Sequence, residues 1–189
     1  MINHACGMQA IIIRMMTDTN KNLFSLDELS GYKVAENYND VRGWNVKDAN
    51  NRAIGKVDHL LVNKTAERVV YLDVEVDETL IEEGHDTYQN RISEGVHEFL
   101  NKEGENHLII PIGMATIDEK NKLVNTNQID SSTFAKAKRF RKGDLIDFAY
   151  ELNLLRHYRG DGTIHSSNTV DGFYDREEFN NTFLQRDME

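Results

Sequence analysis

The stretch that most constrains the fold spans residues 40–76, where three apolar runs are separated by two polar turns. The last run alternates between apolar and polar side chains, as a strand with one buried face does. The turns contain Asn residues, which tolerate the backbone conformations of tight hairpins. Gly55, inside the second run, indicates a β-bulge or a close backbone approach. We therefore predict two consecutive hairpins, the start of an antiparallel sheet, with strands at residues 43–48, 54–62 and 68–76.

A second set of strands is expected at residues 107–126. Residues 107–112 form a buried strand, and Pro111 marks its end or an edge because proline cannot donate to a ladder. Residues 113–117 and 122–126 then pair around a polar turn. Six strands in two groups suit a small closed barrel. The predicted fold class is mainly β with α additions (α+β): a six-stranded antiparallel barrel with an inserted helix and C-terminal helices.

Helical spacing of apolar residues predicts two helices outside the strands. The first covers residues 86–102 within an acid-rich segment and lies across the barrel. The second begins after Gly143, with Asp144 as its N-cap, and runs to about residue 158. One face of this second helix is expected to carry Leu145, Phe148, Ala149, Leu152 and Leu155.

The ends of the chain have a different composition from the barrel. The apolar run at residues 10–13 is too short for the core of a signal peptide, and Met16 is a plausible initiator. A capping box at Ser25 predicts one helical turn before a strand at residues 32–35. The expected parts are a disordered or dispensable N-terminus (1–22), the barrel (23–130), a helical extension (131–159), and a flexible linker with an aromatic tail helix (160–189).

Composition excludes several classes of protein. The formal net charge of −10 argues against broad nucleic-acid binding, which relies on Lys and Arg neutralising phosphates. Cys6 is the only cysteine, so neither an intrachain disulfide nor a cysteine-based zinc site is possible. No apolar run approaches the ~18–20 residues that span a bilayer. We expect a cytoplasmic protein without a membrane span.

No sequence pattern points to chemistry. The seven histidines show no metal-binding spacing, and the acidic turns at residues 48–51 and 118–121 lack a calcium-loop pattern. His59 is interpreted as a satisfied histidine on a strand face, and His107, which opens a strand, as a turn residue. Glycine-rich phosphate loops and nucleophile elbows are absent from the sequence. We predict a protein that is not an enzyme, with no catalytic, cofactor-binding or metal-binding residues and no cofactor.

Five cations in seven residues follow the barrel, with an aromatic ring among them. One interpretation is an interaction patch for RNA, anionic lipid or an acidic partner segment. The other is a solvated linker whose positive charges pair with the acidic segment of its own or a neighbouring chain. The candidate patch is Lys136, Lys138, Arg139, Phe140, Arg141 and Lys142.

One set of glycine, charged and apolar residues agrees with a known pattern at several spacings together: Val41, Arg42, Gly43, Val46, Asp48, Ile54, Gly55, Val57, Leu60, Leu61, Val62, Arg68, Tyr71, Leu72 and Val74, then residues 108–113, Ile117 and Asp118. Together these residues resemble a known family, the PRC-barrel domain. The resemblance covers residues 32–130 and extends loosely to about residue 158. It implies a fold more than an activity, because the residues shared in the family are structural. The overall layout of the chain is similar to stand-alone bacterial proteins that resemble the cytoplasmic domain of the photosynthetic reaction-centre H subunit.

Two functional hypotheses follow. The first is a non-enzymatic module for binding or assembly, with an unknown protein partner. We also expect a homo-oligomer, a dimer or tetramer, because the tail aromatic residues need cover that a short helix cannot give. The second, by analogy with ribosome maturation factors, is an RNA- or ribosome-associated factor, although the net charge makes nucleic acid an unlikely partner. The expected oligomer contacts are Phe173, Tyr174, Phe179 and Phe183.

Overall fold

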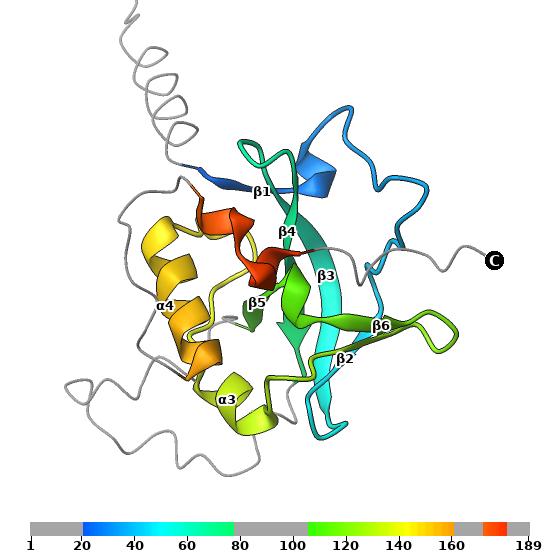
Figure 1. Ribbon diagram of the computed structural model, residues 1–189, viewed down its shortest axis with the longest axis vertical. Coiled ribbons are helices and arrows are strands. Elements are labelled where there is room, and N and C mark those ends of the chain that lie inside the picture. The colour runs from blue at the N-terminus through cyan, green and yellow to red at the C-terminus, as the bar shows by residue number, and fades with distance from the viewer. Residues whose placement is uncertain (1–20, 78–105, 161–171, 181–189) are drawn as a thin grey trace, which may run out of the picture.

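One curved sheet of seven strands organises the molecule (Figure 1). The computed structural model describes residues 21–77, 106–160 and 172–180. The strands follow the order β5-β4-β3-β2-β7-β6, and β1 pairs with β3 beside this path. Their bounds are β1 (Leu23–Ser25), β2 (Asn45–Lys47), β3 (Ala53–Asn63), β4 (Arg68–Val76), β5 (His107–Pro111), β6 (Thr116–Asp118) and β7 (Leu123–Asn125).

The predicted closed, six-stranded antiparallel barrel is wrong, because the sheet is open and has a seventh strand. The end strands β5 and β6 do not pair with each other. The two groups of strands join through β2 and β7, which run parallel with Val46 opposite Val124. The seventh strand, β1, pairs with one end of β3 while β2 pairs with the other end. At three residues each, β6 and β7 are too short to carry the sheet around to β5.

The hairpin turns form for the reasons that the sequence indicated. Asn51 adopts a left-handed backbone, with φ of 64°, at the turn between β2 and β3. Gly55 lies where a Cβ atom would sit 2.0 Å from the carbonyl oxygen of Glu75, so the close backbone approach is confirmed. The predicted strand at residues 32–35 is instead irregular, because that edge of β3 is occupied by β1.

Two α-helices follow β7: α3 (Ser131–Lys136) and α4 (Phe148–Arg159). The predicted cap of the second is wrong, because Asp147 accepts the backbone N–H of Tyr150 while Asp144 accepts that of Arg141 in the preceding loop. The helix therefore starts later than expected, and Leu145 is 52% exposed. Its buried side chains are Glu151, Leu154, Leu155 and Tyr158. The helix predicted over residues 86–102 lies outside the described residues.

Short 3₁₀ turns complete the fold: η1 (Leu26–Glu28), η4 (Ile112–Met114), η5 (Phe173–Asp175) and η6 (Glu177–Phe179). The last two form the C-terminal segment, residues 172–180, which lies against the sheet beside α4 (Figure 1). Gly113 makes this contact possible, since a Cβ there would sit 2.3 Å from the carbonyl oxygen of Glu177. The predicted tail helix is absent from residues 172–180, which form only these two turns.

The core occupies both faces of the central strands. In β4 the residues from Val70 to Val74 are all buried, although their alternation suggested one buried face. The second face is covered by the C-terminal segment, where the ring of Phe179 packs edge-on against Tyr71 at 5.3 Å. In the described part of the chain, no helix is long and apolar enough to cross a bilayer.

Candidate functional site

A β-bulge places two adjacent polar residues of β3 near the same carboxylate. Along a regular strand, neighbouring side chains point to opposite faces. The register of β3 against β4 shifts between Val57 and His59, so that Val57 faces Val74 and His59 faces Asp73. Asp58 is therefore the extra residue of the bulge. As a result, ligand-type atoms of Asp58, His59 and Asp73 all lie within 4.8 Å of one another.

Two further side chains complete this group, which we call the Asp58 cluster: Asp58, His59, Asp73, His107 and Lys142. His107 is buried in β5, and its Nδ1 lies 2.9 Å from Oδ1 of Asp73. The ammonium of Lys142 lies 2.5 Å from Oδ2 of Asp58. Burial acts to raise the pKa of Asp58, but Lys142, His59 and His107 outweigh it, so the pKa is lowered. The hydrogen bond to Asp58 raises the pKa of Lys142.

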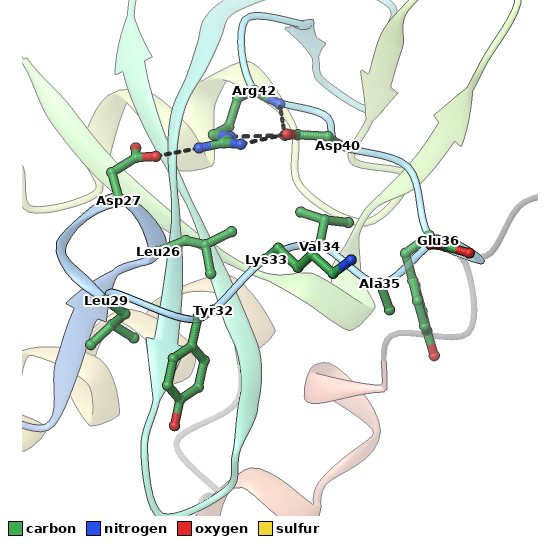
Figure 2. Close-up of a pocket in the computed structure, with 11 residues that line it drawn as sticks. Leu26, Asp27, Leu29, Tyr32, Lys33, Val34, Ala35, Glu36, Asp40 and Arg42 are labelled. Atoms are coloured by element: carbon green, nitrogen blue, oxygen red, sulfur yellow. Dashed lines mark hydrogen bonds and ion pairs between the residues drawn. The ribbon is translucent and has the colours of Figure 1, made fainter.

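A chain of ion pairs extends from the cluster along the surface. His59 Nδ1 lies 3.2 Å from a carboxylate oxygen of Asp27, which follows the Ser25 cap of η1. The other oxygen of Asp27 pairs with Arg42, which also pairs with Asp40 at 2.5 Å. Figure 2 shows the guanidinium of Arg42 held between the two carboxylates. The hydrogen bond from Arg42 lowers the pKa of Asp40 and raises the pKa of Arg42 itself.

Asp27 lines two pockets at once. The first, here the Tyr32 pocket, has a volume of about 560 Å³ and lies under the loop that follows η1. Figure 2 shows the Arg42 ion pairs on one side of it and the ring of Tyr32 on the other. The second, here the His59 pocket, has a volume of about 300 Å³ and reaches Asp73 and Lys142. The ion pairs thus connect two pockets that both have charged and apolar lining residues.

The predicted basic patch is divided by the fold. Lys136 and Lys138 are exposed, whereas Arg139 and Phe140 are buried. Phe140 makes two backbone hydrogen bonds with His107, at 2.9 and 3.1 Å, and thereby adds a bridge to the edge of β5. Lys142 forms an ion pair with Asp58 and belongs to the Asp58 cluster. The six residues therefore do not form one exposed patch. Arg141, like Lys136, Lys138 and Lys142, remains on the surface.

The tail aromatic residues are covered by their own chain. Phe173, Tyr174 and Phe179 are at most 5% exposed, and their rings pack on one another at 5.1–5.2 Å. Arg68 donates to the backbone carbonyls of Phe179 and Tyr174. The expectation that these three side chains need cover from a second subunit is wrong. Phe183 lies outside the described residues.

The Asp58 cluster was missed by sequence reasoning. His59 was expected to be a satisfied histidine on a strand face, and its two carboxylate partners confirm this. His107 does open a buried strand, as predicted, but the interpretation of its side chain as that of a turn residue missed its pairing with Asp73. The one available signal was an Asp-His pair inside an apolar strand, followed by Asp73 at the matching place in the next strand. The bulge at Asp58 brings the side chains of this pattern together into one site.

Comparison with known families agrees with the sheet topology. A model of the PRC-barrel domain matches residues 33–131, which is more than half of the chain and includes β2 to β7. The chain belongs to the PRC-barrel family. No protein of curated function matches it. In this PRC-barrel chain, the match begins within the lining of the Tyr32 pocket, directly after Tyr32, and includes all of the Asp58 cluster except Lys142.

Within the described residues, the histidines are not arranged for nucleophilic catalysis. His59 and His107 face carboxylates, and His157 lies 2.8 Å from the backbone carbonyl of Thr133. A nucleophilic Ser or Thr needs a base within hydrogen-bond reach of its hydroxyl. None of these three imidazoles has such a partner. What the site offers is charge, hydrogen bonding and an accessible aromatic ring.

Proposed function

We propose that this protein is a non-enzymatic PRC-barrel module that binds a partner protein at the Tyr32 pocket. The observation that carries the proposal is Tyr32 itself, which is 46% exposed and lines a pocket of about 560 Å³ together with Leu26, Leu29 and Val34. A tyrosine offers a large apolar surface and a polar tip, and tyrosines are enriched at the centres of protein interfaces. In the described residues, only Leu145 is a comparably exposed large apolar side chain.

The charges of the pocket favour a basic partner segment. Its lining includes three carboxylates, those of Asp27, Glu36 and Asp40, against two cations, those of Lys33 and Arg42. Arg42 pairs with two of the carboxylates, and the lining as a whole carries one more negative charge than positive charges. The chain as a whole carries a formal net charge of −10. We therefore infer a partner segment that presents an apolar side chain to Tyr32 with a Lys or Arg nearby.

The ion pairs of Arg42 hold the loop that forms this pocket in one conformation, which favours binding of a partner. The loop between η1 and β2 has almost no regular structure, so its shape depends on side chains. Arg42 fixes it at two points, to Asp27 on η1 and to Asp40 beside the pocket. A pocket ordered before binding loses less conformational entropy when a partner arrives. The three described histidines support a non-enzymatic role, because His59 and His107 face carboxylates and His157 faces a backbone carbonyl. None of them activates a hydroxyl group.

Site-specific photocrosslinking in cells tests the proposal. A photoreactive phenylalanine at position 32 is expected to capture one partner protein, and the same residue at exposed Lys136 is the control. With the purified partner, Y32A should weaken binding about 10-fold or more, as truncation of a central interface residue does, while Y32F retains most of the affinity. The same adduct from both positions, a second copy of this chain as the captured protein, or unchanged affinity in Y32A would overturn the proposal.

The alternative of an RNA- or ribosome-associated factor has less support. It depended on a continuous basic patch, and the burial of Arg139 and Phe140 removes the middle of that patch. The ammonium of Lys142 is matched by Asp58. Phosphate recognition needs several cations on one accessible surface. We therefore favour a protein partner.

A further inference from the structure

Three residues of the Asp58 cluster have the chemistry and spacing of metal ligands. His59 Nε2 lies 3.3 Å from Oδ2 of Asp58. Two ligands at about 2.0–2.1 Å from a tetrahedral metal ion are themselves about 3.3 Å apart. Asp73 supplies the third ligand atom, within 4.8 Å of the other two. A small side-chain adjustment of Asp73 would bring all three to one centre.

The neighbours of these ligands are arranged as a supporting shell. Metal-binding histidines usually direct their second ring nitrogen at a carboxylate, which fixes the orientation of the ring. Asp27 takes this place at Nδ1 of His59, and Arg42 holds Asp27. Metal-binding carboxylates are in turn hydrogen-bonded. The buried imidazole of His107 holds Asp73 in this way, with its Nδ1 2.9 Å from Oδ1.

A cation already pairs with one of the three candidate ligands. The ammonium of Lys142 lies 2.5 Å from Oδ2 of Asp58, while its side chain is 59% exposed and comes from a loop. Such a side chain can move into solvent, and the half-buried carboxylate of Asp58 would then pair with the metal ion instead of the ammonium. This movement would leave Asp58 free to bind a metal ion beside His59 and Asp73, two residues that line the His59 pocket and so give access from solvent.

We propose that Asp58, His59 and Asp73 form a binding site for a divalent transition-metal ion such as Zn²⁺, which displaces Lys142. One imidazole and two carboxylates suit a borderline ion such as Zn²⁺ better than Mg²⁺ or Ca²⁺, which prefer oxygen ligands only. Because His59 and Asp73 line the His59 pocket, water or a ligand from a partner can reach the ion and complete its coordination. This inference does not depend on protein binding at the Tyr32 pocket.

Titration of the full chain with Zn²⁺, and with Co²⁺ followed by its visible absorption, tests the site. We expect one site whose affinity falls at least 10-fold in D58N and in H59Q. K142M retains every ligand and removes the competing ammonium, so it should bind more tightly. D27N, which removes the support of His59, should weaken binding about 10-fold or more. H157Q is the matched control and should bind as the original chain does.

The outcomes separate the proposal from adventitious binding by other histidines. Absence of Zn²⁺ binding in the original chain would overturn it. Binding that D58N and H59Q leave unchanged would assign the metal to other residues and also overturn it. Circular dichroism would show whether the loss of a charge unfolds D58N. In that case K142M still tests the proposal, because it keeps all three ligands. Equal or weaker binding by K142M would contradict displacement of the lysine.

Discussion

At the scale of single residues, Asp48 shows how one carboxylate can join distant parts of the fold. It is buried, and its Oδ1 accepts the backbone N–H groups of Asn50 and Arg52 within the β2–β3 turn. Its Oδ2 accepts the N–H of Ser131, 83 residues later in the chain. Asp118 occupies the matching place in the β6–β7 turn, but it is only half-buried, and its carboxylate accepts the backbone and side-chain N–H groups of Asn121 within the same turn.

We expect D48A to destabilise the protein by about 3–4 kcal/mol, because hydrogen bonds to a charged acceptor contribute about 1.5–3 kcal/mol each and are not fully additive. Urea unfolding followed by circular dichroism measures the change in the free energy of unfolding. D118A is the matched control and should change stability much less than D48A. Equal effects of the two substitutions would show that the bond to Ser131 contributes nothing.

The sequence was informative about residues whose role is local and silent about those whose role depends on distant partners. Asn51 and Gly55 were predicted from turn and bulge chemistry, and both predictions are confirmed. Asp48 was expected to be a turn residue, and its bond to Ser131 could not be foreseen. The Asp58 cluster depends on a register shift between β3 and β4. A one-residue shift in pairing leaves no periodic pattern in the sequence, so the site was not predicted.

At the scale of elements, the strands were predicted better than what covers them. The third predicted strand, residues 68–76, matches β4 in full, because alternation over nine residues is a strong pattern. The cover of β4 was not predicted, since it comes from α4 and the C-terminal segment. Glu151 of α4 joins these two elements: it is fully buried and accepts the hydroxyl of Tyr174 at 2.7 Å.

The burial of Glu151 predicts a pH dependence of stability. Burial raises the pKa of Glu151 to about 7, above its ordinary 4.5, so the folded state binds the proton more tightly than the unfolded state. The stabilisation is complete below about pH 4.5 and is lost as the pH rises through about 7, by about 3 kcal/mol in total. Urea unfolding at pH 5 and pH 8 should show this loss in the original chain and not in E151Q. The exposed variant E119Q is the control, and equal pH slopes in all three proteins would contradict the assignment.

At the scale of the whole molecule, the C-terminal segment completes the core of its own chain. Phe179 is fully buried between Tyr71 of β4, Phe173 and Tyr174. The segment is further held by the ion pair of Arg159 with Glu178. An aromatic tail in a sequence suggested a surface for self-association. In the folded chain the same residues are internal, so they provide no apolar surface for a dimer or tetramer.

We therefore expect F179A to lower stability without changing the oligomeric state of the protein. Truncating a fully buried phenylalanine costs about 3–5 kcal/mol, because the ring leaves a cavity that the surrounding side chains fill only in part. Urea unfolding measures this loss, and light scattering coupled to size-exclusion chromatography measures the molar mass in native buffer. L145A, which truncates an exposed apolar side chain, is the control and should change neither quantity by much. If F179A converted an oligomer into a stable monomer, Phe179 would have to contribute to an interface between subunits. The intramolecular packing of its ring against Tyr71 argues for the opposite result, a destabilised protein of unchanged mass.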